Sequence, residues 1–130
     1  MCVYFLLFFK DHYMQVDFGG DLTTAILVSP TFALTNRTSC LTFLYQMNGD
    51  SVRLYVNVTR ADGNVETLLV KTFADQINYP SWSSAYVTME AFQQIIFVAD
   101  KFGYTAGSYS VFLDDITISD RQCLTGDIQL

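Results

Sequence analysis

The sequence predicts an all-β fold, an antiparallel β-sandwich or barrel, and two observations support this prediction. Apolar residues recur at every second position through most of the chain, and the enriched residues are β-branched and aromatic. Gly, Asn, Asp and Pro separate these short apolar segments, and no segment shows sustained helical periodicity. Such a pattern is typical of many short strands joined by turns, and it disfavours a parallel α/β sheet.

The first expected strands cover residues 13–18, 25–28 and 41–47, each bounded by turn-forming residues. The clearest strand follows at residues 52–59, where Val and Leu alternate with Arg, Tyr, Asn and Thr. This alternation indicates one face on a core and the other in water. The Asp62-Gly63 pair then favours a tight turn into residues 65–72, which completes a hairpin. The last expected strands cover residues 85–89, 94–99 and 109–119.

Composition indicates one acidic globular domain. The chain has 130 residues, a common size for a single domain, and 51% of them are hydrophobic, so we expect one core. Thirteen acidic and seven scattered basic residues give a net charge of −6, which disfavours nucleic acid as a partner. His12 is the only histidine, and zinc-ligand spacing and a glycine-rich phosphate loop are both absent from the sequence. We therefore expect no enzyme activity.

Residues 1–10, MCVYFLLFFK, form an atypical apolar segment. They lack the basic start and the cleavage site of a signal peptide, and they are shorter than the about 20 residues of a spanning helix. We therefore expect no transmembrane segment in this chain. Three interpretations stay open: a translated tract outside the domain, a degenerate signal, or a buried strand. The domain is expected at residues 11–123, followed by a tail or the start of a linker at residues 124–130.

Two N-x-S/T acceptors, at Asn36 and Asn57, indicate glycosylation and an extracellular location. Asn36 lies in a polar loop, and Asn57 falls on the polar side of the clearest strand. Both are expected to be accessible to glycan transfer, although strand pairing would hinder access to Asn57.

The positions of two of the three cysteines suit a disulfide. Cys40 stands near the start of one expected strand, and Cys123 stands just after the end of another. The alternative is two buried free thiols, since unpaired cysteine packs as a small hydrophobic residue. A bridge closing a loop of this length would contribute roughly 4 kcal/mol. Cys2 then has no second cysteine to pair with.

Several motifs follow one another in a characteristic order. They are CLTFLYQMNG from Cys40, Trp82 with SAYVTM, FQQIIFVAD from Phe92, Gly103-Tyr104, and LDDI from Leu113 followed by Cys123. In order and spacing, from about Tyr13 to Cys123, they resemble the MAM domain family. The resemblance implies a jelly-roll-like antiparallel sandwich, and together with the acceptors at Asn36 and Asn57 it favours the Cys40–Cys123 disulfide. The family's usual amino-terminal block, with a first cysteine and a Phe-Glu pair, has no match before Tyr13.

The acidic pair Asp114 and Asp115 is the one constellation that could carry chemistry. Phase with Phe112 and Ile116 predicts that Asp114 lies on an apolar face. A carboxylate there needs hydrogen-bond donors, a basic side chain or a metal ion. In some MAM domains an acidic residue of this motif helps to bind a calcium or sodium ion, and Asp17 is the obvious second ligand here. We weigh a structural hydrogen-bonding role against this cation site.

The resemblance implies a non-catalytic extracellular module for protein–protein interaction and cell adhesion, within a larger secreted or membrane-anchored protein. Its expected partners are other extracellular domains or a second copy of itself. The alternative is a calcium-dependent, lectin-like carbohydrate-binding sandwich. Phe102 and Tyr104 are candidates for the contact surface, or they cover the end of the sandwich. For Trp82, the resemblance favours a position in the core over a binding anchor.

Overall fold

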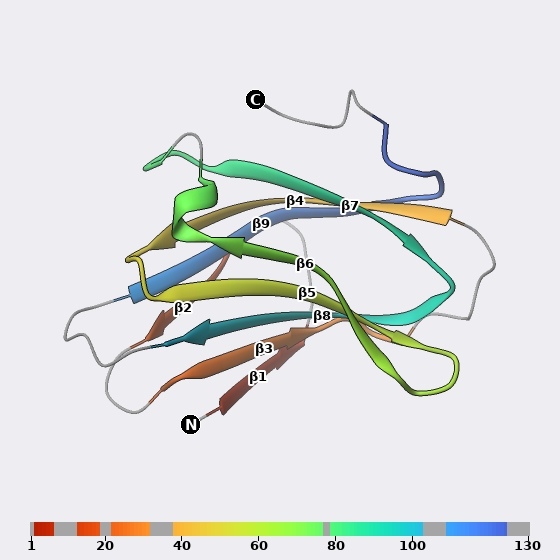
Figure 1. Cartoon of the computed structure of the whole chain (residues 1–130), viewed down its shortest axis with the longest axis horizontal. Helices are drawn as coiled ribbons and strands as arrows, with labels where there is room; N and C mark the ends of the chain where they lie inside the picture. The colour runs from red at the N-terminus through yellow and green to blue at the C-terminus, as the bar shows by residue number, and fades with distance from the viewer. Residues whose placement is uncertain are drawn as a thin grey trace.

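The computed structural model describes the backbone of residues 2–6 and, with side chains, residues 13–18, 22–31, 38–76, 79–102 and 109–124. The described part forms two packed β-sheets with a single short 3-10 helix, η1 (Phe73–Asp75) (Figure 1). The strands are β1 (Cys2–Leu6), β2 (Met14–Phe18), β3 (Thr24–Val28), β4 (Thr38–Asn48), β5 (Val52–Arg60), β6 (Val65–Thr72), β7 (Ser83–Glu90), β8 (Phe92–Lys101) and β9 (Tyr109–Ser119).

The strand order is that of a jelly roll. One sheet has the order β1-β3-β8-β5-β6 and the other has the order β2-β9-β4-β7. From β2 onwards the chain pairs with itself like one long hairpin, because β2 pairs with β9, β3 with β8, β4 with β7, and β5 with β6. Successive pairs alternate between the two sheets, which rolls this ribbon into a sandwich. The predicted all-β sandwich is therefore confirmed.

Each strand expected from the sequence is present. β6 and β9 have the expected bounds, and the other strands differ from the expected ranges by one to three residues at their ends. β4 is an example: it begins at Thr38 because its first residues already pair with the end of β7, where Thr38 lies opposite Glu90. The first and last residues of a strand depend on pairing partners that are distant in the sequence. Local alternation therefore does not predict these bounds.

Residues 2–6 form strand β1, which pairs with β3. Cys2 lies opposite Thr24, and Leu6 lies opposite Val28. This pairing is parallel, whereas the other strand pairs in the described part of the chain are antiparallel. β1 therefore forms one edge of the five-stranded sheet and covers the edge of β3.

The core lies between the two sheets and follows from the alternation seen in the sequence. In β5, Val52, Leu54, Val56 and Val58 are at most 1% exposed, and the residues between them lie on the outer face of the five-stranded sheet. Across the sandwich, buried Phe43 of β4 meets buried Phe97 of β8 edge to face, with ring centroids 5.2 Å apart. Such aromatic pairs add about 1 kcal/mol beyond their burial. The two sheets are thus joined by one continuous apolar layer.

The pKa of Tyr45 allows its burial in this core to be tested. Its side chain is 1% exposed, and its hydroxyl donates to the Asp75 carbonyl oxygen at 3.5 Å. Burial, with a smaller contribution from the Asp75 carboxylate, raises the pKa of Tyr45 from 10.0 to about 12. Between these two values the unfolded chain releases the Tyr45 proton and the folded chain keeps it. The free energy of unfolding should therefore fall as the pH rises from about 10 to about 12.

Urea unfolding at several pH values across this range checks the prediction. Tyr45→Phe should lose stability less steeply with pH than the unmodified chain, because it has no proton to release at that position. Equal slopes for the two proteins would contradict the assignment.

Candidate interaction surface

Three aromatic side chains meet on the outer face of the four-stranded sheet. Phe112 lies in β9 between the buried residues Val111 and Leu113, so its side chain points away from the core. Its ring centroid is 5.9 Å from that of Tyr13, just before β2, and 6.1 Å from that of Trp82, just before β7. The Tyr13 and Trp82 rings are 6.2 Å apart. We call Tyr13, Trp82 and Phe112 the aromatic trio.

The trio is open to solvent and is not part of the buried core. Tyr13 is 53% exposed, and Phe112 and Trp82 are half-buried. All three lie at one end of the sheet, and they come from segments that are distant in the sequence. An exposed group of touching aromatic rings supplies a large rigid surface at a small entropic cost, which is the property that contact surfaces use.

Hydrogen bonds from β4 fix the segment that leads to Trp82. The Gln46 side-chain amide donates to the Pro80 carbonyl oxygen, and the Tyr79 hydroxyl donates to Asn48 Oδ1 at 2.8 Å. Tyr79 also packs edge to face on Phe73 of η1, with ring centroids 5.0 Å apart. Trp82 is therefore presented by a segment that is fastened to its neighbours.

A shallow polar hollow lies further along the same sheet. It is lined by Thr42, Phe43, Leu44, Ser84, Ala85, Asp115 and Thr117. The hollow coincides with a β-bulge, because the register between β4 and β9 shifts between Thr42 and Leu44. Asp115 occupies the left-handed region with φ 49°, which aspartate tolerates better than most residues. The bulge thus places an exposed carboxylate beside the hydroxyls of the hollow.

Asp114 shares a face with Phe112, as expected, but that face is the outer face of the four-stranded sheet and not the core. The inward residues of β9 are Tyr109, Val111 and Leu113, so Asp114 lies on the outer face in phase with Phe112. The bulge at Asp115 changes the alternation, and the sequence phase read across it was therefore misleading. The Asp114 carboxylate accepts the backbone N–H of Asp115 at 2.8 Å, which is a structural role of the kind that we weighed.

The structure does not bring Asp17 and Asp114 together. Asp17 lies opposite Ser110, four positions along β9 from Asp114, which is a separation of roughly 13 Å in an extended strand. The exposed Asp17 carboxylate accepts the Ser110 hydroxyl at 2.6 Å and the Gln15 amide at 2.8 Å. These bonds, chiefly the one from Ser110, lower the pKa of Asp17. Among the described residues, no group of three or more potential metal ligands is found.

Phe102 lies elsewhere on the molecule, just after β8 at the end of the five-stranded sheet. It is 40% exposed, and the Arg53 guanidinium lies 4.3 Å from its ring centroid. Arg53 also reaches Asp100, with Nε 3.5 Å from the carboxylate oxygen. The ring of Phe102 thus packs on the Arg53 guanidinium at the end of the sheet. Tyr104, the other predicted contact residue, lies outside the described residues.

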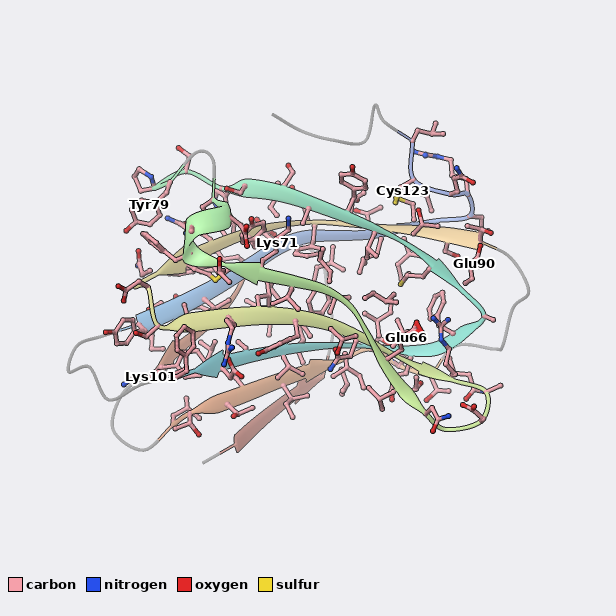
Figure 2. All side chains as sticks on the ribbon, viewed as in Figure 1. Glu66, Lys71, Tyr79, Glu90, Lys101 and Cys123 are labelled. Atoms are coloured by element: carbon pink, nitrogen blue, oxygen red, sulfur yellow. A yellow bond between two sulfur atoms is a disulfide. The ribbon has the colours of Figure 1, made fainter. Side chains whose placement is uncertain are left out.

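Cys40 and Cys123 are joined by a disulfide, as the resemblance implied, with the sulfur atoms 2.00 Å apart. The backbone N–H of Cys123 also donates to the Thr88 hydroxyl of β7 at 3.1 Å. Figure 2 shows Cys123 and Tyr79 at opposite ends of the sandwich, so the bridge closes the end away from the trio. Cys2 lies in β1, and its side chain is not described.

Of the two predicted glycosylation acceptors, only Asn57 lies among the described residues. Asn57 is half-buried on the outer face of the five-stranded sheet, between Ile96 of β8 and Thr67 of β6. Asn36 lies outside the described residues.

Sequence reasoning missed the trio. Trp82 was expected in the core, yet it does not belong to the cluster of buried residues and packs outside the four-stranded sheet. A signal existed in β9, because Phe112 alternates with Val111 and Leu113, and if these two residues face the core then Phe112 faces outward. The positions of Tyr13 and Trp82 beside Phe112 depend on strand pairing and carried no such signal.

A jelly-roll sandwich whose exposed face carries touching aromatics beside a polar hollow has the architecture of a binding module. A family model described as MAM domain, meprin/A5/mu, matches residues 9–124. The meprin A subunit alpha of Rattus norvegicus is 30% identical over 120 residues, which cover 88% of this chain. The chain belongs to the MAM domain family, whose members are extracellular interaction modules. It spans only 16% of the length of that relative.

Solved structures with the same fold include two β-sandwich proteins. One is the K1 cleaved adhesin domain of Lys-gingipain from Porphyromonas gingivalis W83, at 20% identity and a TM-score of 0.58, which covers 84% of this chain and 73% of that one. The other belongs to carbohydrate-binding modules of the β-sandwich superfamily, at 13% identity and a TM-score of 0.53, which covers 82% of this chain and 53% of that one. These similarities concern the fold. Within the described residues, no helix has the length and hydropathy of a membrane span.

Proposed function

We propose that this chain is a non-catalytic extracellular module that binds other proteins through the aromatic trio. The observation that carries the proposal is the contact of Tyr13, Trp82 and Phe112 on the exposed face of the four-stranded sheet. Aromatic side chains are enriched in the residues that dominate protein interfaces, and tryptophan and tyrosine lead them. The partner is another extracellular domain or a second copy of this chain, and contact serves cell adhesion within a larger secreted or membrane-anchored protein.

The extracellular location is supported by the family and by the disulfide. Bridges of this kind persist in oxidising compartments and are rare in the cytosol. The predicted glycosylation of Asn36 and Asn57 belongs to the same proposal.

A second candidate is carbohydrate binding on the same face. It is favoured by the polar hollow on the same sheet as the trio, where Thr42, Ser84 and Asp115 offer hydroxyl and carboxylate groups. A sugar site needs such a combination of aromatic surface and fixed polar groups. The sandwich of carbohydrate-binding modules described above has the same fold.

One set of binding measurements separates these functions. The domain, displayed as a multimer, is applied to an array of extracellular protein domains that includes the chain itself, and to a glycan array with calcium or with a chelator. We expect binding to protein. Tyr13→Ser and Trp82→Ser should each weaken that binding by about tenfold or more, because a central aromatic contributes more than about 1.4 kcal/mol.

Phe102→Ser is the matched control, since Phe102 is also an exposed aromatic but lies at the end of the other sheet. It should bind as the unmodified domain does. Loss of binding with Phe102→Ser alone would move the contact surface to that end. Binding to glycans that needs Trp82, without binding to any protein, would replace the first candidate by the second. Thermal unfolding of each variant verifies that the fold is intact.

A further inference from the structure

The outer face of the five-stranded sheet is apolar on the side of Asn57 that faces β8. Asn57 lies opposite Ile96, and Tyr55, two residues earlier in β5, lies opposite Val98. All four side chains are half-buried and occupy outward positions, since the residues between them are in the core. Two positions along a strand are about 7 Å apart, and directly opposed residues are closer. Ile96 and Val98 thus border Asn57 with apolar surface, whereas the Tyr55 hydroxyl is hydrogen-bonded to Asp100 and its ring extends away from Asn57.

The side-chain amide of Asn57 is oriented by β6. The Thr67 hydroxyl donates to Asn57 Oδ1 at 2.7 Å. With Oδ1 held towards Thr67, Nδ2 lies on the side away from β6. Among the described residues no acceptor binds this Nδ2. Nδ2 is the atom that carries the sugar in an N-linked glycan, and Asn57-Val58-Thr59 is a complete acceptor.

We propose that Asn57 carries an N-linked glycan whose first N-acetylglucosamine packs on Ile96 and Val98. The apolar C–H face of the sugar covers these side chains in place of water, and the sugar hydroxyls stay in contact with solvent. Transfer takes place on the unfolded chain, so pairing of β5 in the finished sheet does not prevent it. The glycan then acts as part of the fold, covering the five-stranded sheet and leaving the four-stranded sheet open. This inference rests on the extracellular location in the proposed function, but it is independent of binding through the aromatic trio.

The test uses the whole chain, secreted from cells behind a cleavable leader. Mass spectrometry of glycopeptides first measures occupancy at Asn57. An endoglycosidase then trims the glycan to a single N-acetylglucosamine, and the melting temperature is compared with that of Asn57→Gln. We expect the sugar to raise the melting temperature by about 3 °C, the size of one favourable packing contact in a domain of this length. Asn36 is kept in every protein, so its contribution cancels.

The same comparison in three further backgrounds locates the contact. Ile96→Thr and Val98→Thr keep a β-branched residue in the strand but remove apolar surface, so each should abolish most of the gain. Ile118→Thr makes the same exchange in the other sheet, where Ile118 is 37% exposed, and it should leave the gain unchanged. An unmodified Asn57 would overturn the proposal. A gain that is absent, or equal in all backgrounds, would equally overturn it, because the sugar would then lie away from this face.

Discussion

Replacing Cys40 and Cys123 together by alanine is expected to lower the free energy of unfolding by about 4 kcal/mol. The bridge joins residues 83 positions apart, and cutting it releases that long loop in the unfolded chain. Domains of this size are stable by only about 5 to 15 kcal/mol, so the variant should be close to unfolding at body temperature. Alanine is chosen because Cys40 is 1% exposed, and serine would bury a hydroxyl there.

Urea unfolding of the two proteins, with and without a strong reductant, checks this expectation. Reductant should lower the midpoint of the unmodified chain and leave the midpoint of the double variant unchanged. Because Cys2 is present in both proteins, any effect of its thiol appears equally in each. A midpoint that reductant does not move in the unmodified chain would show that the bridge contributes nothing.

Gly49→Ala is expected to cost roughly 3 kcal/mol, a larger effect than the same exchange at Gly63, the other glycine in the described part of the chain. Gly49 joins β4 to β5 with φ 94°, a conformation that other residues adopt only with strain. A Cβ placed there would lie 1.8 Å from Cδ1 of Tyr109, whose side chain is 7% exposed. The buried ring cannot move away without disturbing the start of β9, so strain and overpacking add together.

Gly63→Ala is the matched control. Gly63 has φ 87° in the turn between β5 and β6, but nothing lies within 4 Å of an added Cβ. It should therefore cost only about 1 kcal/mol, from backbone strain alone. In a Tyr109→Ala background, Gly49→Ala should fall to the same cost, because the obstructing ring is gone. Equal costs for both glycines in the unmodified chain would mean that the Tyr109 ring gives way freely.

The strand content of the fold could be predicted well from the sequence. The alternation around Val56 and Val58 reported a half-buried strand directly, because side chains in a strand point to opposite faces in turn. The Asp62-Gly63 turn was equally clear, and the structure shows the hydrogen bonds that close it, from Gly63 N to Arg60 O at 2.9 Å and from Arg60 N to Asn64 O at 2.8 Å. Both predictions depend only on residues close together in the sequence, so they do not require knowledge of strand pairing.

The candidate site was harder to predict, and β9 shows why. The strand contains a bulge at Asp115, which changes the alternation in its second half. Asp114 therefore shares the outer face with Phe112, whereas Ile116, beyond the bulge, packs against the core, although the sequence phase placed all three together. A bulge depends on how two strands align over their whole length, so the sequence next to Asp115 does not predict it.

By itself, the sequence determined the class of fold and the strands, since both are encoded in residue types at short spacing. The order of its motifs predicted the family and, through that resemblance, the Cys40–Cys123 disulfide. The tertiary structure alone decided that Tyr13, Trp82 and Phe112 meet on one exposed face, that Asp17 and Asp114 lie apart, and that Asn57 borders apolar side chains of β8. These relations arise from the register between strands that are distant in the chain. Register is fixed by burial of all the inward residues together, so no single segment contains it.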